Sequence, residues 1–293
     1  MLVKAFLEYL RYDRNYSGCT VTAYRTDLKE FEKFFRSEDE ELGWETIDAD
    51  IVRRWMVQLM DDGRATTSVN RKLSSIRSFY KYLRSKGVVT RDFFVKVKGP
   101  KNNKPLPAFV KETDMDRLLD EVDFGEGFAA CRDKMVVEML YATGMRLAEL
   151  VGLNDKDVDF SAGQIKVTGK RNKQRLIPFG EELRCSMLTY LNMRIVSCPR
   201  LSEAFFVSDK GSRISRGKVG SLVKIALSKV VGLKRRSPHV LRHSFATSML
   251  NNHAELGVVK ELLGHESLAT TEIYTHTTFE ELKEVYKLAH PRA

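Results

Sequence analysis

The chain has 293 residues, which is long enough for two domains with separate cores. Lysine and arginine number 49 against 39 aspartate and glutamate residues, and the net charge of +10 favours a polyanionic partner, with nucleic acid and an anionic membrane surface both qualifying. No run of about 18 apolar residues occurs, and the first ten residues carry a basic and an acidic residue at helical spacing, so the sequence supports neither a transmembrane helix nor a signal peptide. It predicts a soluble, cytoplasmic protein.

Residues 1–95 are predicted to form a compact domain of four helices, because apolar residues recur there at intervals of three and four. Thr20 and Asp48 are candidate helix caps, and Gly63 and Gly87 are candidate helix ends. The apolar positions are Leu2, Phe6 and Leu10, then Tyr24, Leu28, Phe31 and Phe35, then Ile51, Trp55 and Leu59, and finally Val69, Leu73, Ile76, Tyr80 and Leu83.

Basic residues surround the fourth of these helices. Such a run is more often a solvated face, and charge alone favours that interpretation. The alternative is a surface that binds the phosphates of DNA. The residues are Arg64, Arg71, Lys72, Arg77, Lys81 and Arg84.

Residues 96–107 change composition to four lysines, three prolines and one glycine without apolar periodicity. Proline favours an extended path, and lysine is attracted to phosphate. This stretch is therefore predicted to be a linker between the first domain and a second domain of residues 108–293.

The second domain is predicted to be helical apart from one β-hairpin, so the fold class is mostly α with a small sheet (α+β). A helix begins near Glu112, and a longer apolar one over Met135–Tyr141 ends at Gly144. Arg146 then opens a short helix. An exposed ion pair with Glu149, worth well under about 1 kcal/mol, is the ordinary interpretation of that arginine.

The hairpin is predicted from two β signals, Gln164–Thr168 and Arg175–Phe179, joined by a basic loop that is often only a solvated turn. Helices near Glu181–Ile195 and Gly217–Val231 then flank a short strand over Ala204–Ser208. The basic loop residues are Lys170, Arg171, Lys173 and Arg175, and a second basic run, Lys234, Arg235 and Arg236, is predicted to contact phosphate.

Ser237 is predicted to cap the next helix, with Pro238 at its first position. His239 then lies in the first turn, and Arg242 follows three residues later on the same face. An imidazole, a guanidinium and free backbone N–H groups at one helix start make an anion site. The opposite, buried stripe is formed by Leu241, Phe245 and Met249.

A further helix over Leu256–Leu263 is predicted to end at Gly264, with His265 directly after it and Tyr274 nine residues later. A single histidine or tyrosine is more often a packed, hydrogen-bonded residue than a catalyst, so neither residue alone indicates catalysis.

Metal ligation is an alternative for His239 and His243, which have the spacing of ligands on one helical face. Val240 stands where a zinc protease would carry glutamate, and no cysteine or carboxylate cluster is near in the sequence, so neither a metal nor another cofactor is expected. The cysteines have no metal or disulfide spacing and are predicted to be reduced thiols: Cys19, Cys131, Cys185 and Cys198.

The polar residues in this order resemble the signature of the tyrosine recombinases, also called the phage integrase family. The C-terminal part of the resemblance is His239-x-x-Arg242-His243, then Leu263-Gly264-His265, then Tyr274. Upstream, Thr143–Leu150 resembles the family's first arginine box and Thr168–Arg175 its lysine-bearing hairpin. The resemblance covers nearly the whole chain.

This resemblance implies a metal-independent site in which Arg146 and Arg242 bind the scissile phosphate and Tyr274 attacks it, forming a 3′-phosphotyrosine. Lys170 is then the general acid. Lys173 is a weaker alternative, because Arg171 stands where the family usually has glycine.

Two histidines complete the implied site. His239 is the candidate general base, and His265 donates a hydrogen bond to a non-bridging oxygen. The sequence does not separate these two roles.

The resemblance also implies that residues 1–95 form a core-binding domain that clamps double-stranded DNA against the catalytic domain. The tail carries an apolar stripe that packs either on its own domain or, as in the family, on a neighbouring protomer, which makes 279–290 an expected exchange helix in a homo- or hetero-tetramer on two duplexes. The stripe consists of Leu282, Val285, Tyr286 and Ala289.

The function expected from the resemblance is site-specific DNA recombination. The His-Pro-Arg-Ala ending resembles the Xer-type resolvases of chromosome dimers. The alternatives are the integrase of a phage, conjugative transposon or other mobile element, a type IB topoisomerase and, in a different class, a non-catalytic DNA-binding protein.

Overall fold

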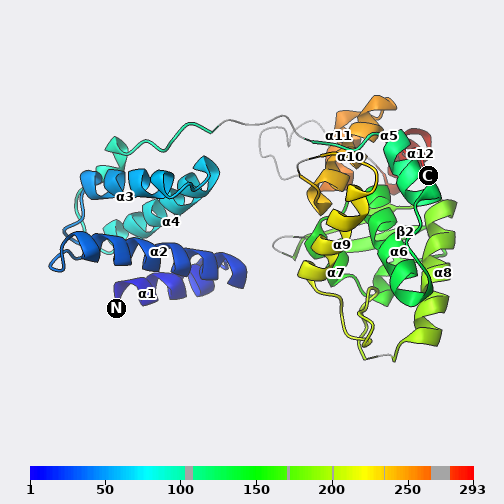
Figure 1. Cartoon of the computed structure of the whole chain (residues 1–293), viewed down its shortest axis with the longest axis horizontal. Coiled ribbons are helices and arrows are strands. Elements are labelled where there is room, and N and C mark those ends of the chain that lie inside the picture. The colour runs from blue at the N-terminus through cyan, green and yellow to red at the C-terminus, as the bar shows by residue number, and fades with distance from the viewer. Residues whose placement is uncertain (103–107, 170–171, 200, 234, 265–277) are drawn as a thin grey trace. The chain divides into compact units, whose positions relative to one another are not determined.

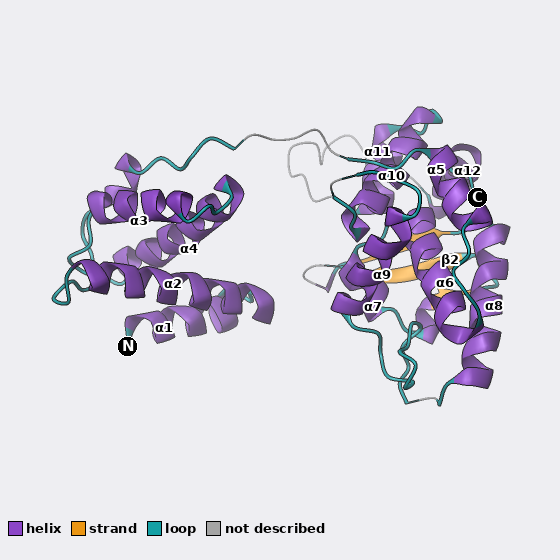
Figure 2. Ribbon diagram, in the orientation of Figure 1, coloured by secondary structure: helices purple, strands orange, loops and turns teal. Residues whose placement is uncertain are grey.

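The structure is a computed structural model that describes residues 1–102, 108–169, 172–199, 201–233, 235–264 and 278–293 (Figure 1). The chain divides into two compact units, Met1–Pro105 and Leu106–Ala293. Helices dominate both units and one small sheet lies in the second (Figure 2), which confirms the predicted α+β class. In the described part of the chain, no helix has the length and apolar content to cross a bilayer.

The first unit contains the four predicted helices. The core between them is aromatic, and the Phe31 and Trp55 rings, for example, have centroids 4.9 Å apart. Burial of one such side chain contributes roughly 1.5–3 kcal/mol, so these rings fix the packing of the helices. The helices are α1 (Leu2–Glu8, continued by the π-helix Tyr9–Asp13), α2 (Gly18–Glu38), α3 (Ala49–Asp61) and α4 (Thr66–Ser85), followed by the 3₁₀ turn Phe93–Lys96.

The two predicted caps have different outcomes. Asp48 is confirmed, because its Oδ1 accepts hydrogen bonds from the N–H groups of Asp50 and Ile51 at 2.9 and 3.0 Å. Thr20 is wrong as a cap. The hydroxyl of Ser17 accepts from the Thr20 N–H at 3.3 Å, so Ser17 caps α2 and Thr20 lies in its first turn.

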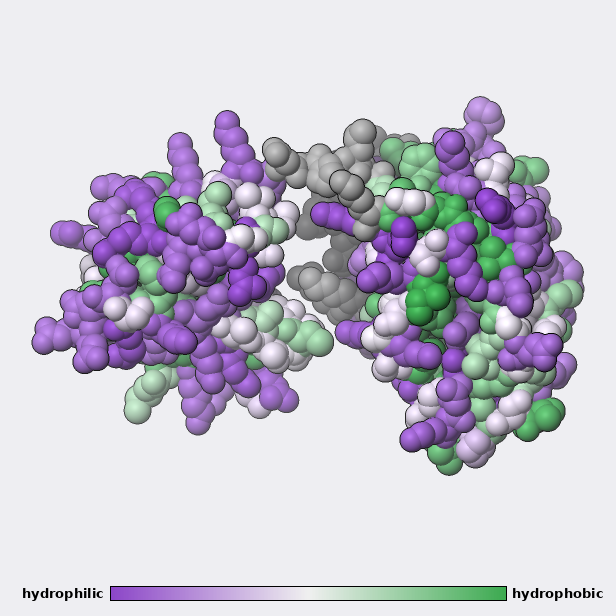
Figure 3. All heavy atoms as spheres, viewed as in Figure 1, coloured by the Kyte–Doolittle hydropathy of each residue, from purple (hydrophilic) through white to green (hydrophobic). Residues whose placement is uncertain are grey.

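The basic face of α4 is smaller than predicted. Lys72 is buried between α4 and α2, where its Nζ pairs with Asp27 at 3.5 Å and with Glu30. Arg71 donates to both carboxylate oxygens of the buried Asp27, at 2.6 and 2.9 Å. The prediction of an exposed Lys72 was therefore wrong. The surface of this unit is nevertheless mostly hydrophilic on the face that Figure 3 shows.

The second unit is built around one buried helix, α6. Its residues Met135–Thr143 are almost all inaccessible to solvent, and it packs against α8, α9 and α10. A helix buried on all sides needs the apolar surface on every face that this stretch provides. The helices are α5 (Glu112–Asp116, continued by the π-helix Arg117–Glu121), α6 (Gly127–Thr143), α7 (Leu147–Gly152), α8 (Glu181–Ser197), α9 (Arg216–Ser228), α10 (Pro238–Asn251), α11 (Leu256–Leu263) and α12 (Phe279–Ala289).

The sheet is antiparallel, with the order β1 (Val158–Asp159), β2 (Gln164–Thr168) and β3 (Gln174–Pro178). β2 and β3 form the predicted hairpin, although β3 begins one residue earlier than predicted, and β1 was not predicted. The strand predicted over 204–208 was wrong. That segment makes only isolated bridges to two different partners, Asn154 and Arg213, and so cannot continue one ladder.

The tail helix α12 packs against α10 and α11 of its own domain through Leu282, Tyr286 and Ala289. Beyond it, the His290 ring stacks on Tyr286 with centroids 5.1 Å apart. Exchange of this helix between subunits stays a prediction.

The last residues are fixed by an ion-pair cluster. The two terminal nitrogens of Arg292 donate to the two carboxylate oxygens of Asp120 at 2.9 Å each, and Arg292 also pairs with Glu182 and Asp116. The cluster ties Arg292 to the last residue of α5, to the π-helix that continues it and to the first turn of α8.

Acidification is expected to destabilise the domain through His290. Burial lowers the pKa of this imidazole to about 4. The unfolded chain binds the proton below about pH 6.5, so the stabilising contribution is complete above that pH and is lost as the pH falls towards 4, by up to ~3 kcal/mol. Urea unfolding at pH 7.5 and 4.5 measures it, with the His290→Phe variant as reference.

The Glu138→Gln variant is the control for that measurement, because it removes a second buried group whose protonation changes over the same pH range. Burial raises the pKa of Glu138 to about 7, so this carboxyl contributes with the opposite sign and weakens the fold as the pH rises through 7. A stability difference between wild type and His290→Phe that stays the same at pH 7.5 and 4.5 would contradict the assignment.

Candidate active site

Three arginines from three different elements meet the C-terminal end of α11. The last carbonyls of a helix have no partners within it and carry partial negative charge, which guanidinium donors satisfy. Arg175 Nε donates to Leu262 O at 2.7 Å, Arg242 Nη2 to Leu263 O at 2.6 Å and Arg146 Nη2 to Gly264 O at 2.8 Å. One helix end therefore fixes all three guanidinium groups.

Of the three arginines, Arg242 is the one that is buried, with 8% of its surface exposed. Its Nη1 donates to the carbonyl of Gly144 at 2.7 Å, in the turn that ends α6. Burial, followed by the nearby charges of Arg146 and Arg175, lowers the pKa of Arg242 to about 10. The group remains a cation at pH 7, and its positive charge is only partly compensated by protein groups.

The Gly144 turn must be glycine for two reasons. Its φ of +59° lies in the left-handed region, and an added Cβ would lie 2.5 Å from Phe245 Cδ1 and 2.9 Å from Leu263 Cδ2. The predicted end of α6 at Gly144 is confirmed. This turn places Arg146, which precedes α7, beside α10 and α11.

The buried carboxylate of Glu149 accepts hydrogen bonds from both the backbone and the side chain of Arg146. Its Oε1 accepts from Arg146 Nη1 and its Oε2 from the Arg146 backbone N–H, both at 2.8 Å. Burial opposes ionisation of Glu149, but hydrogen bonds from Arg175 and Arg146 outweigh it and lower the pKa of the carboxyl. The ion pair was predicted to be exposed, and that was wrong, because the Glu149 side chain is 2% exposed.

His239 lies on the exposed side of α10, three residues before Arg242. Pro238 is at the first position of this helix and Ser237 at the cap position, as predicted, although Ser237 makes no side-chain capping bond. The predicted buried stripe is confirmed, since Leu241, Phe245 and Met249 are inaccessible to solvent. Among the described residues, no group of three histidine, cysteine or acidic side chains is placed to bind a metal.

Three of the predicted catalytic residues, Lys170, His265 and Tyr274, lie outside the described residues. The described residue before each of the first two lies next to Arg146. The carbonyl of Gly264, which precedes His265, accepts a hydrogen bond from Arg146 Nη2. A Cβ added to Gly169, which precedes Lys170, would lie 3.9 Å from Arg146 Nη1. The structure thus brings Arg146 and Arg242 together and places His239 on the same helix as Arg242.

Arg175 has a role that the sequence did not reveal. It was predicted to begin the second strand and to belong to the basic loop. The structure confirms the strand position, on β3, where Arg175 pairs with the buried Val167 and donates to both carboxylate oxygens of Glu149. The available signal was the period of two in a strand, since Arg175 shares a face with Ile177, which is fully buried.

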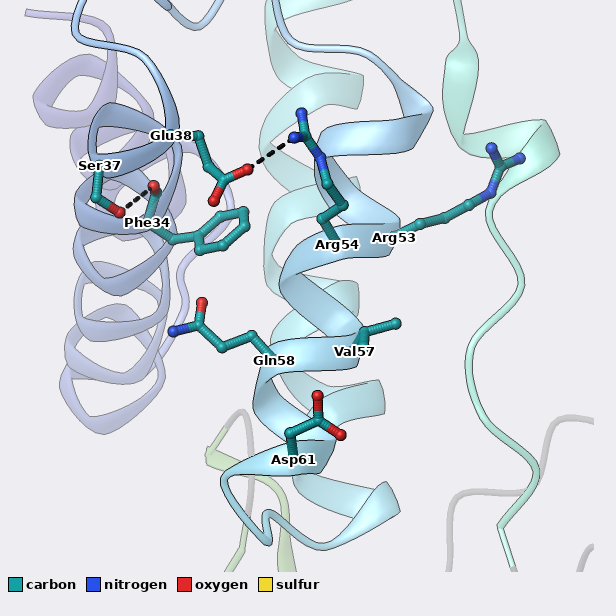
Figure 4. A pocket seen from close by; sticks show the side chains of 8 residues that line it. All are labelled: Phe34, Ser37, Glu38, Arg53, Arg54, Val57, Gln58 and Asp61. Atoms are coloured by element: carbon teal, nitrogen blue, oxygen red, sulfur yellow. Dashed lines mark hydrogen bonds and ion pairs between the residues drawn. The ribbon is translucent and has the colours of Figure 1, made fainter.

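A pocket between α2 and α3 offers no comparable convergence (Figure 4). Its charged groups pair locally, because Arg54 Nη1 contacts Glu38 Oε2 at 2.8 Å and Arg53 pairs with Asp50 in the same helix turn. The arginine cluster of the second unit is therefore the candidate active site. The pocket is lined by Phe34, Ser37, Glu38, Arg53, Arg54, Val57, Gln58 and Asp61.

Comparison with protein families gives matches in both units. Residues 108–281 match the phage integrase family, and residues 3–87 match the phage integrase N-terminal SAM-like domain. Together the two matches cover most of the chain.

Similar full-length proteins carry the name tyrosine recombinase. XerC of Chlorobaculum tepidum is 39% identical over 314 residues, covering 98% of this chain and 94% of the relative. XerC of Listeria innocua is 38% identical, covering 100% and 98%. XerD of Oceanobacillus iheyensis is 33% identical, covering 99% and 98%.

Solved structures of recombinases have the same fold. XerH bound to its difH substrate matches with a TM-score of 0.70 at 23% identity, covering 95% of this chain and 82% of that one. A lambda integrase dimer bound to a core site matches with a TM-score of 0.71 at 17% identity, covering 95% and 98%. From the family matches and the full-length relatives, the chain belongs to the phage integrase family and is a tyrosine recombinase.

Proposed function

We propose that this protein is a site-specific recombinase that cleaves and rejoins DNA strands through a 3′-phosphotyrosine, with an Xer-type role in resolving chromosome dimers. The observation that carries the proposal is the convergence of Arg146 and Arg242 on the end of α11, directly before His265 in the sequence. Family membership and the full-length similarity to XerC proteins support it.

The two arginines account for the charge that phosphodiester cleavage develops. A pentavalent phosphorane carries negative charge on its non-bridging oxygens, and planar guanidinium donors match pairs of such oxygens. Both guanidinium groups are already oriented by backbone carbonyls and Glu149. A site of this kind stabilises the transition state without reorganising during the reaction.

The remaining steps are assigned to residues of the family motif. Tyr274 attacks the phosphorus and forms the 3′-phosphotyrosine, while His239 is the candidate base for the phenol proton and His265 donates to a non-bridging oxygen. Lys170 protonates the leaving 5′ oxygen. Because the phosphotyrosine ester conserves the bond energy of the phosphodiester, a 5′-hydroxyl of another strand can reverse the step without ATP.

Double-stranded DNA is the proposed partner, with residues 1–95 as the core-binding domain, 96–107 as the linker and 108–293 as the catalytic domain. The net charge of +10 supports this. So does a groove beside α4 whose lining includes four basic residues, although one of them, Arg84, pairs with Asp92 in the same groove. The basic residues are Arg77, Lys81, Arg84 and Arg91. Four protomers, identical or of two related kinds, would hold two duplexes, with α12 as the exchange helix.

We propose that the protein is located in the cytoplasm. The function is tested by recovering covalent protein–DNA complexes from the host cells and sequencing the attached DNA. An Xer-type role predicts enrichment of one chromosomal site that is independent of mobile elements. Enrichment at the ends of an element would indicate an integrase. Attachment at random positions would indicate a topoisomerase, and absence of covalent complexes would indicate a non-catalytic DNA-binding protein.

Chelation is expected to leave cleavage unchanged. Guanidinium groups and imidazoles take the charge-neutralising role that metal ions have in many nucleases. The measurement is the rate of covalent adduct formation on a nicked suicide duplex of the recovered sequence, with and without EDTA at constant ionic strength. Loss of adduct with EDTA and its return with a divalent metal would contradict the proposed mechanism.

A further inference from the structure

Arg175 is largely buried in the β2–β3 ladder, in the second residue pair from the loop, rather than exposed in the loop itself. It pairs with Val167 across the β2–β3 ladder, and its side chain is 14% exposed. Successive strand residues point to opposite faces, so Arg175 lies on the inward face with Ile177. The arginine therefore faces the candidate active site from the strand that follows the Lys170 loop in the sequence.

All three nitrogens of the Arg175 guanidinium have partners there. Nη1 and Nη2 donate to Oε1 and Oε2 of Glu149 at 2.9 Å each, and Nε donates to Leu262 O at 2.7 Å. Gly264 allows this approach, because its φ is +64° and an added Cβ would lie 3.2 Å from Arg175 Cδ. The fork joins β3 to the residue that holds Arg146 and to the end of α11.

The charge of Glu149 is shared between two arginines. Its Oε1 accepts from Arg146 at 2.8 Å and from Arg175 at 2.9 Å. A buried carboxylate with one cationic partner would hold that partner with its whole charge, in competition with a bound phosphate. With Arg175 present, three arginines and one glutamate leave two formal positive charges in the cluster.

We propose that Arg175 is a positioning residue for DNA cleavage. By sharing the charge of Glu149 and tying β3 to the end of α11, it leaves Arg146 available to bind the scissile phosphate. This inference rests on the proposed recombinase function. It assigns to Arg175 no contact with the reacting atoms.

The electrostatic effect of Arg175 extends to the second arginine. After burial and Arg146, the charge of Arg175 is the next cause that lowers the pKa of Arg242. Removal of Arg175 therefore changes the field at both guanidinium groups that are proposed to bind phosphate. A loss confined to folding would not depend on the charge of the substrate.

The test compares Arg175→Met, Arg175→Lys and the double variant Arg175→Met with Glu149→Gln. Lys166→Met is the matched control, because it removes a positive charge from the outward face of the same hairpin. Single-turnover cleavage at saturating protein is measured on the suicide duplex with an ordinary phosphodiester, and again with a neutral methylphosphonate at the scissile position.

Arg175→Met is expected to slow phosphodiester cleavage on the order of a hundredfold, with the affinity for DNA unchanged within about threefold. The deficit should shrink to about tenfold or less on the methylphosphonate, which needs less positive charge. Arg175→Lys should be intermediate, since it keeps the charge and loses the planar fork. In the double variant, the Glu149 carboxylate no longer holds Arg146, so cleavage should be faster than in Arg175→Met. This variant is also expected to fold, because it removes the buried carboxylate together with its partner Arg175.

Equal losses on both substrates, or cleavage by Arg175→Met within about threefold of wild type, would overturn the proposal. If Arg175→Met does not fold, the same comparison is made with Arg175→Lys and the double variant. Failure of the wild-type protein to form an adduct would instead refute the proposed function itself. The two failures are therefore distinguishable.

Discussion

Replacing Tyr274 with phenylalanine is expected to abolish covalent attachment to DNA and to leave DNA binding intact. The phenol oxygen is the atom that bonds to phosphorus, and no other group of the proposed site replaces it as a nucleophile. The position of Tyr274 in the family motif carries this prediction. The measurement is the yield of detergent-resistant adduct on the nicked suicide duplex, with binding followed by gel shift.

Tyr286→Phe is the matched control, because it removes a tyrosine hydroxyl from the same C-terminal region. The Tyr286 ring packs in the core, and its hydroxyl is buried without a hydrogen-bond partner among the described residues. This variant should form the adduct at a rate within about twofold of wild type. Wild-type adduct yield from Tyr274→Phe would show that another residue is the nucleophile.

Loss of either phosphate-binding arginine is expected to have the second large effect. Arg146→Ala and Arg242→Ala should each slow cleavage on the order of a hundredfold or more, because each removes a preorganised donor for the charge that develops on phosphate. Arg242→Lys should also be impaired. Its ammonium keeps the charge but cannot donate from one plane to Gly144 O, Leu263 O and a phosphate.

The cleavage rate is measured in a single turnover with saturating protein, so that an effect on binding does not enter. Arg184→Ala is the control, since Arg184 is an arginine of α8 whose ion pair with Glu181 spans 3.7 Å. It should cleave at a rate within about twofold of wild type. Wild-type cleavage by Arg242→Lys would argue against direct guanidinium contact with the phosphate.

The sequence predicted those elements whose ends are set locally. Gly144 and Gly264 end α6 and α11 where predicted, because a left-handed residue at a helix end favours glycine wherever the helix lies. Asp48 caps α3 for an equally local reason. The two-residue strand β1 was not predicted, since a segment this short depends on its pairing with β2.

The site was predictable in identity and less so in its contacts. Arg146, His239 and Arg242 were named from motif spacing, and the structure brings the two arginines to one helix end. The burial of Glu149 and Lys72 was missed, because charged residues are ordinarily exposed and only the tertiary packing supplies their partners. Arg175 was missed as a contact for the same reason.

The most direct test of the account is the chemical identity of the protein–DNA link. The adduct formed on the suicide duplex in the presence of EDTA is digested, and the peptide that carries the nucleotide is sequenced by mass spectrometry. The account predicts a 3′-phosphate ester at Tyr274 and a free 5′-hydroxyl on the released strand. A link through a 5′-phosphate, or at any residue other than Tyr274, would contradict it.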